Sequence, residues 1–153
     1  MAGITIFIGA DHRGFKAKQR LVSYLTGLYD GVEVVDMGAY EYEPDDDFND
    51  SAIAVAQKLS EHPKAGYGIL LCGSSFGVCM QANRFPHVRA INPLTPEVTK
   101  LGRQHNAANV LCLSADQLSF AEMRDILHVF LQTPPLPDSR FRRRNQRLDE
   151  VFE

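Results

Sequence analysis

GILLCGSSFG, residues 68–77, is an apolar run of strand length that ends at Cys72 and continues as a short loop of glycine and serine. Uninterrupted apolar residues are typical of a strand that is buried on both faces of a parallel sheet. A helix beginning in the loop would place Cys72 at the positive end of a helix dipole, among backbone N–H groups without helical partners. Such surroundings can lower a thiol pKa and hold an anion, so this loop is the first candidate for chemistry.

Alternating strand and helix patterns extend from this stretch in both directions. The other predicted strands are 4–8, 32–35, 88–91 and 110–113, and the predicted helices are 15–29, 47–59, 76–83, 96–105 and 119 or 120 to 131, before a basic segment over 139–151. Apolar strands that alternate with helices indicate a parallel sheet covered on both faces. We therefore predict an α/β fold, a three-layer αβα sandwich with a five-stranded, Rossmann-like parallel sheet.

Composition narrows the class of protein. A chain of 153 residues, 44% apolar and 23% charged, fits one domain with a sizeable core. The net charge of −3 argues against a nucleic-acid partner, and no apolar run approaches the roughly 18 residues of a membrane span. Cys72, Cys79 and Cys112 lack metal or disulfide spacing, and the N-terminus lacks a signal-peptide pattern. We expect a cytoplasmic protein without a membrane partner, with Cys79 and Cys112 as core residues.

Ligands of open parallel sheets bind beyond the carboxyl ends of the strands. That rule selects the residues after the predicted strands: Asp11 and His12, 36–40, 72–77, Asn92 and Ser114. The turn GADHRG, residues 9–14, brings a carboxylate, an imidazole and a guanidinium together, and its two glycines do not match the dinucleotide fingerprint. The alternative is an ordinary turn in which Asp11 caps the next helix.

A second group of polar residues lies in the C-terminal part of the chain. His105 ends a predicted helix and is either a helix C-terminal cation or an acid/base group. Arg140 and Arg144 are four residues apart, which places both on one helix face and suits contact with a phosphate. The alternative is a solvated basic tail.

In combination, these motifs resemble the ribose-5-phosphate isomerase B family, within the wider ribose/galactose phosphate isomerase group. The resemblance covers nearly the whole chain, and the motifs that carry it are 6–12, 68–74, 82–84, 103–110 and the pair Arg140 and Arg144. It implies a single isomerase domain over 1–153, with the basic segment 134–153 at a dimer interface. It also implies a homodimer whose active sites draw residues from both subunits.

The resemblance further implies conversion of an aldose phosphate to a ketose phosphate through a cis-enediolate, with no metal and no cofactor. Cys72 would be the base, Ser74 would orient a substrate oxygen where the family usually has threonine, and His105 would open the sugar ring. The remaining implied substrate-binding residues are Asp11, His12, Gly73, Ser75, Phe76, Gly77, Asn106, Arg140 and Arg144. Backbone N–H groups from Gly73 to Gly77 would hold the enediolate oxygen.

Several positions depart from the family pattern. Asp116 replaces a phosphate-binding arginine, Phe48 replaces a tyrosine, and Phe141 replaces a frequent histidine. A carboxylate beside a phosphate is unfavourable unless Asp116 turns away or pairs with a cation such as Arg13 or Arg140. The leading hypothesis is a ribose 5-phosphate and ribulose 5-phosphate isomerase. An isomerase of a six-carbon sugar phosphate, such as allose or galactose 6-phosphate, and a non-catalytic sugar-phosphate-binding homologue remain open.

Overall fold

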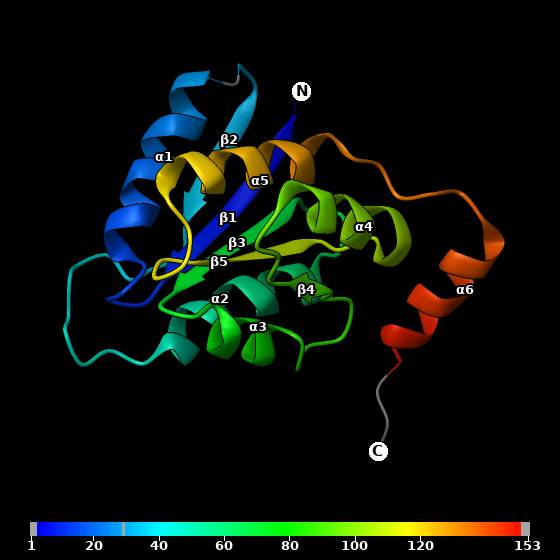
Figure 1. The fold of residues 1–153 in the computed structure, drawn as a ribbon. Helices are drawn as coiled ribbons and strands as arrows, with labels where there is room; N and C mark the ends of the chain where they lie inside the picture. The colour runs from blue at the N-terminus through cyan, green and yellow to red at the C-terminus, as the bar shows by residue number, and fades with distance from the viewer. Residues whose placement is uncertain (1–2, 29, 151–153) are drawn as a thin grey trace.

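The computed structural model describes residues 3–28 and 30–150, and it confirms the predicted α/β sandwich (Figure 1). The strands are β1 (Ile4–Ala10), β2 (Val32–Asp36), β3 (Tyr67–Cys72), β4 (Ala90–Ile91) and β5 (Val110–Ser114). The helices are α1 (Phe15–Leu28), α2 (Phe48–Glu61), α3 (Phe76–Ala82), α4 (Pro96–Asn106), α5 (Phe120–Gln132) and α6 (Ser139–Leu148). All strand pairs are parallel, in the order β2-β1-β3-β5-β4.

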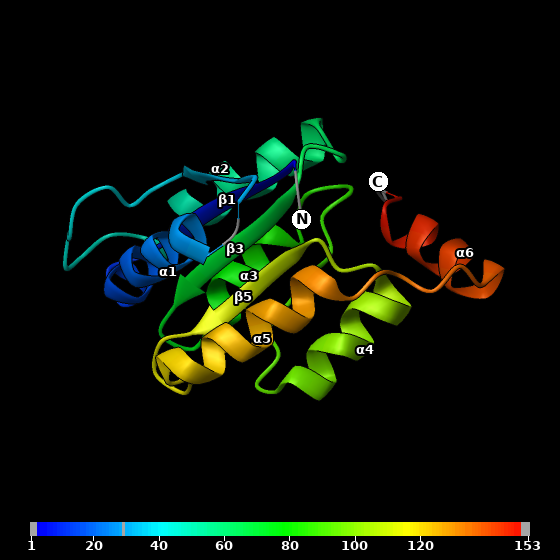
Figure 2. The same cartoon turned by 90° about the horizontal axis from the view of Figure 1, so that it is seen from above.

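Helices cover both faces of the sheet, as Figure 2 shows. Helices α1 and α5 bury residues such as Leu21 and Phe130 on one face, and α2 and α3 bury residues such as Val55 and Val78 on the other. The central strand β3 contributes to both cores because its side chains alternate, with Ile69 on one side and Leu70 on the other. The predicted pattern of a strand buried on both faces is therefore confirmed.

Helix α6 differs from the other helices. It follows an extended connector after α5, packs mainly on α4, and has no buried residue of its own (Figures 1 and 2). Among the described residues, no helix combines the length and the apolar character needed to cross a membrane.

The predicted element boundaries hold to within a few residues, and β4 loses half of its predicted length. The strand predicted over 88–91 is reduced to Ala90–Ile91. At the start of this strand, backbone N–H groups donate to side-chain amides and not to a neighbouring strand. Asn109 Oδ1 accepts from the Arg89 N–H at 2.8 Å, and Asn83 Oδ1 accepts from the Ala90 N–H at 2.8 Å. The predicted ends at Tyr29 and Val151 lie outside the described residues.

Candidate active site

Cys72 is the last residue of β3, at the carboxyl edge of the sheet, and only 5% of it is exposed. Backbone hydrogen bonds join the start of its loop to the end of β5: the Ala115 N–H donates to the Cys72 carbonyl at 2.9 Å, and the Asp116 N–H donates to the Gly73 carbonyl at 3.0 Å. The Ser114 hydroxyl donates to that same Gly73 carbonyl at 2.6 Å. The Cys72 loop, residues 72–77, is therefore held by its neighbouring strand.

The electrostatic surroundings of the Cys72 thiol act in two directions. Burial raises its pKa and is the largest influence, while backbone N–H groups of Val78, Ser75 and Gly77 lower it, and the Asp11 carboxylate raises it. The net pKa lies above that of an ordinary thiol, so the lowered pKa that the helix start suggests is wrong for the isolated chain. The physical reason is desolvation, which a dipole argument leaves out.

The residue before helix α3 gives no side-chain cap to the N–H groups of the first turn. Ser75, the residue before the helix, has a left-handed backbone with φ of 69° and makes no capping hydrogen bond. Within residues 3–28 and 30–150, the Ser74 hydroxyl accepts from the Phe76 N–H alone, at 3.2 Å. The amides that face the thiol are therefore available to an anion as well as to Cys72.

Asp11 and His12 lie at the end of β1, beside the Cys72 loop. Asp11 is 6% exposed, and its Oδ1 accepts from the Arg13 and Gly14 N–H groups, both at 3.0 Å. Burial raises the Asp11 pKa despite these hydrogen bonds. Asp11 thus closes the turn into α1, as the capping alternative predicts, and still keeps its second carboxylate oxygen for a ligand.

His12 has a partner that sequence analysis missed. Asp46 Oδ1 accepts from the His12 backbone N–H at 2.9 Å and contacts the His12 Nδ1 at 2.8 Å. An ionised carboxylate only accepts, so Nδ1 carries the proton and Nε2 faces away from this pair. Asp46 belongs to an acidic run that reads as a solvated loop, and no local pattern signals its contact with a residue 34 positions earlier.

Three residues here have the character of metal ligands. Asp11, His12 and Asp46 each offer a ligand atom, and these atoms lie within 4.8 Å of one another. Carboxylate and imidazole groups suit a divalent cation. In this structure, however, one Asp11 oxygen accepts from the backbone of the turn, and one Asp46 oxygen contacts the His12 Nδ1. The expectation that the protein uses no metal stays a prediction.

Arg13 neutralises Asp116 directly above the Cys72 loop. Arg13 Nη2 and Asp116 Oδ2 are 2.6 Å apart, which confirms Arg13, not Arg140, as the partner. The guanidinium lies so close to Gly73 that a Cβ there would stand 2.9 Å from Arg13 Cζ. A side chain at residue 73 would therefore displace the Arg13 guanidinium from this position, and the negative charge of Asp116 does not face the loop unpaired.

Two phenylalanines shape the start of α3. A Cβ at Gly77 would stand 2.9 Å from the Phe48 ring, so this ring packs closely against the first turn of α3. Phe76 projects outward and is 54% exposed. The Cys72 loop is therefore bordered by two phenyl rings at the start of α3.

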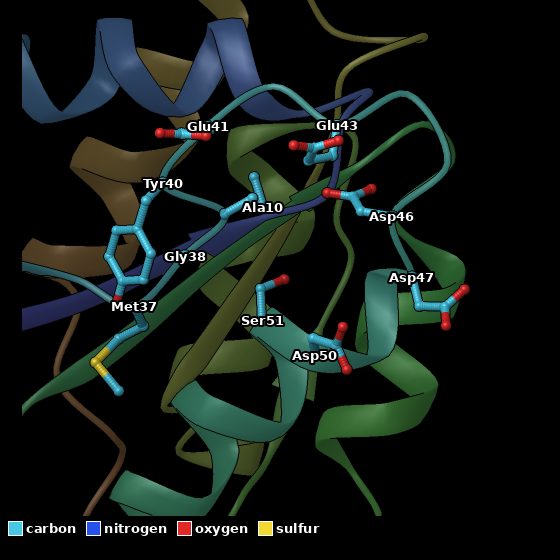
Figure 3. A pocket seen from close by; sticks show the side chains of 11 residues that line it. Ala10, Met37, Gly38, Tyr40, Glu41, Glu43, Asp46, Asp47, Asp50 and Ser51 are labelled. Atoms are coloured by element: carbon cyan, nitrogen blue, oxygen red, sulfur yellow. The ribbon is translucent and has the colours of Figure 1, made fainter.

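A cavity of about 430 Å³ lies at the carboxyl ends of β1 and β2 (Figure 3). Figure 3 shows Glu41, Glu43 and Asp46 along the loop above Ser51 of α2. With Asp47 and Asp50 these residues make the cavity acidic, which disfavours a sugar phosphate. Cys72 does not line it, so the volume alone does not mark the site.

His105 and Asn106 form the last turn of α4, where α6 packs. The imidazole of His105 and the ring of Phe141 are stacked, with centroids 4.7 Å apart and planes inclined by 11°. The Arg140 guanidinium carbon lies 4.9 Å from the centroid of the same phenyl ring. Arg144 lies on α6 one turn after Arg140. These residues form a second group, which we call the α4–α6 unit: His105, Asn106 and residues 139–148.

The structure does not bring the α4–α6 unit to the Cys72 loop within one chain. Helix α4 runs back toward the amino ends of the strands, because its last residues lead directly into β5, and α6 extends further along that side (Figures 1 and 2). Asp11, His12, Ser74, Ser75, Phe76 and Gly77 lie with Cys72 at the carboxyl edge. The predicted site is thus divided into two groups.

A parallel α/β sandwich with a cysteine at the end of its central strand and a histidine at a helix end has the groups that proton transfer on a sugar needs. The chain belongs to the ribose/galactose isomerase family, whose model matches residues 6–150. It is an isomerase, and its curated relatives show which kind of isomerase it is similar to. It is 37% identical over 127 residues to the probable ribose-5-phosphate isomerase B of Mycoplasma pneumoniae, covering 83% of this chain and 82% of that protein.

Matches that cover more of the chain are also to ribose-5-phosphate isomerase B proteins. Ribose-5-phosphate isomerase B of Mycobacterium tuberculosis is 33% identical over 153 residues, which cover all of this chain and 91% of the relative. A crystal structure of the Mycoplasma genitalium enzyme with bound ribulose-5-phosphate superposes with a TM-score of 0.90 at 34% identity, covering 97% of this chain and 96% of that one. The Thermotoga maritima enzyme gives a TM-score of 0.88 at 37% identity, covering 97% and 99%.

Proposed function

We propose that the chain interconverts ribose 5-phosphate and ribulose 5-phosphate through a cis-enediolate, without a metal. The observation that carries this proposal is the position of Cys72, which ends β3 against backbone N–H groups of Ser75, Gly77 and Val78. A base and a set of oxyanion donors are thereby adjacent, which is what proton transfer between two neighbouring carbons requires. The relative that binds ribulose-5-phosphate supports the choice of a pentose phosphate.

Cys72 would act as the base. Its thiolate removes the proton from C2 of the open-chain aldose, and the electron pair moves onto the carbonyl oxygen O1 to give the enediolate. The hydroxyl proton then passes from O2 to O1 along the cis edge, and the same thiol returns a proton to C1. A raised pKa makes the thiolate a stronger base once it forms. The guanidinium groups of Arg140 and Arg144, brought near by a partner subunit, would favour that thiolate by charge.

The α4–α6 unit would prepare the substrate. His105 would move a proton between the ring oxygen and the anomeric hydroxyl, with Asn106 and Asp11 binding hydroxyl groups. Arg140 and Arg144 would hold the phosphate through charge-assisted hydrogen bonds, with His12 in support.

Because one chain holds the two groups apart, we propose a homodimer in which each site combines the Cys72 loop of one subunit with the α4–α6 unit of the other. Segment 134–153 would then lie at the interface. Large apolar side chains on the surface support this: Phe76 is 54% exposed, and Met80, one turn later on α3, is 71% exposed. The cytoplasmic location expected from the sequence also stays a prediction.

The direct test measures product formation together with the entry of solvent deuterium into the substrate. The wild-type protein, incubated with ribose 5-phosphate in heavy water, is expected to form ribulose 5-phosphate and to introduce solvent deuterium into the substrate. Absence of both product and exchange would refute the proposal. Allose 6-phosphate and galactose 6-phosphate serve as parallel substrates, and faster turnover of either would favour the six-carbon alternative.

The shared site has its own test. Cys72→Ala and His105→Asn each disable a different half of the site, so both homodimers should be inactive. Mixing the two after mild denaturation and refolding should restore part of the activity, because a heterodimer has one site with both native groups. Two inactive variants that stay inactive when they form heterodimers would rule out the sharing.

A further inference from the structure

Phe141 is the contact between two functional groups of the α4–α6 unit. Its ring stacks on the His105 imidazole at 4.7 Å with an 11° inclination, and the Arg140 guanidinium carbon lies 4.9 Å from its centroid. The stack uses the flat face of the imidazole, and the guanidinium carbon lies over the phenyl ring. The edge of the imidazole, where its ring nitrogens point, therefore stays available.

The imidazole of His105 has no other partner within the part of the chain that the structure describes. Neither of its ring nitrogens makes a hydrogen bond there, in contrast to His12, whose Nδ1 contacts Asp46 at 2.8 Å. Rotation about the bond to an imidazole ring is broad and poorly restricted by the side chain itself. Stacking restricts this rotation without occupying a nitrogen, as a group that must both give and take a proton requires.

Helix α6 depends on side-chain contacts for its position. It has ten residues and none is buried, and so short a helix is marginal on its own. Asn145 Nδ2 donates to the His105 carbonyl at 3.1 Å, and Arg89 pairs with Asp149 at 2.6 Å just beyond the helix. Together with the Phe141 stack, these contacts hold α6 against the end of α4.

The connector that leads to α6 is tied to α4 as well. The Leu136 N–H donates to the Gln104 carbonyl at 3.0 Å, and Arg103 Nε donates to the Thr133 carbonyl at 3.0 Å. Asp138 caps α6 by accepting from the Arg140 N–H at 2.7 Å. The backbone of Arg140 and the ring of Phe141 are thus placed by α4, the helix that carries His105.

We propose that Phe141 is a positioning residue that holds His105 and Arg140 as one preassembled unit, so that the ring-opening group and a phosphate-binding group meet the sugar phosphate at a set spacing. This inference rests on the proposed function of His105 and Arg140. It adds a role for a residue that departs from the family pattern, and it applies within a single chain, before any partner subunit is considered.

The first test needs no substrate. Protein labelled with ¹³C at histidine is observed by NMR, and the His105 signal among the five histidines is assigned with His105→Asn. Ring current from Phe141 should move the His105 ring protons upfield. Phe141→Leu should remove this displacement, Phe141→Tyr should keep it, and the matched control Gln146→Leu, on the same helix, should not change it. An unchanged His105 signal in Phe141→Leu would overturn the proposal.

The second test separates ring opening from isomerisation. Ribulose 5-phosphate cannot close a five-membered ring, because its terminal hydroxyl carries the phosphate, so exchange of its C1 proton with solvent deuterium needs Cys72 but no ring opening. In Phe141→Leu we expect kcat for ribose 5-phosphate to fall about tenfold, because the misplaced imidazole reacts poorly. The maximal rate of C1 exchange should stay within about twofold of wild type, since that step does not involve His105.

KM should rise for both sugars, because Arg140 also loses its place, whereas Phe141→Tyr should keep kcat and both KM values near those of the wild type. Equal loss of ring opening and C1 exchange, or normal turnover by Phe141→Leu, would overturn the positioning role. A wild type that neither isomerises nor exchanges would refute the proposed function instead, and the NMR signal would still decide whether the stack forms.

Discussion

The Cys72 loop and the α4–α6 unit are held in place by different forces. The loop follows a fully paired central strand, is tied to β5 by backbone hydrogen bonds, and lies over a buried core. The α4–α6 unit lies on the surface, where one ring stack and a few polar contacts hold a helix without buried residues. The difference teaches that the proposed base is fixed by the fold itself, whereas the proposed substrate-binding unit is fixed by individual side chains.

Removing the base should have the largest effect. Cys72→Ala is expected to lower isomerisation and deuterium exchange by about 10²- to 10⁴-fold, the range of a lost general base, while sugar-phosphate binding is retained. The assay is proton exchange by NMR. Cys79→Ala is the matched control, because Cys79 lies in the same core and has no part in the proposed reaction. Exchange that survives in Cys72→Ala would mean that another residue is the base.

Removing a phosphate-binding arginine from the α4–α6 unit should have a smaller effect, which is seen as a higher KM. Arg144→Ala is expected to raise KM for ribose 5-phosphate about tenfold or more, because a charge-assisted hydrogen bond contributes roughly 1.5–3 kcal/mol. Steady-state kinetics measures this, and Arg142→Ala, on the same exposed helix, is the control. If the two variants have the same KM, the basic helix acts only through its overall charge.

Breaking the ion pair above the Cys72 loop should change substrate affinity by a few fold. Arg13→Ala leaves Asp116 unpaired and should raise KM about threefold, since exposed charges interact weakly through solvent. Asp116→Asn should lower KM slightly, and the double variant should lie close to wild type. These differences should vanish at high salt. A KM that stays unchanged in Arg13→Ala would show that the substrate does not sense this pair.

The pH dependence should report burial of the base. Because burial raises the pKa of Cys72, the folded protein keeps the thiol proton at pH values where the unfolded chain has lost it. Alkylation of Cys72 by iodoacetamide, mapped by mass spectrometry, should therefore rise with pH through a midpoint above that of the urea-unfolded protein. For the same reason, stability contributed by the neutral thiol is lost as pH rises above the unfolded pKa. A lower midpoint in the folded protein would show that the N–H groups outweigh burial.

The hydrophobic pattern was sufficient for most of the fold. The apolar run before Cys72 predicts a strand buried on both faces, and Ser119 predicts the start of α5, where the capping box with Glu122 forms. Strand β4 is shorter than predicted because side-chain amides take its first backbone groups, and such contacts come from residues distant in the chain. Asp46 was missed for the same reason.

Sequence alone determined the strand order along the chain, the position of Cys72 at a strand end, and the pairing of arginines on one helix face, because these follow from local periodicity. Tertiary structure decided which edge of the sheet each group occupies. It separated His105 from Cys72, placed Phe141 on His105 and Arg13 on Asp116, and desolvated the thiol. Contacts and burial depend on how distant segments pack, so no local pattern contains them.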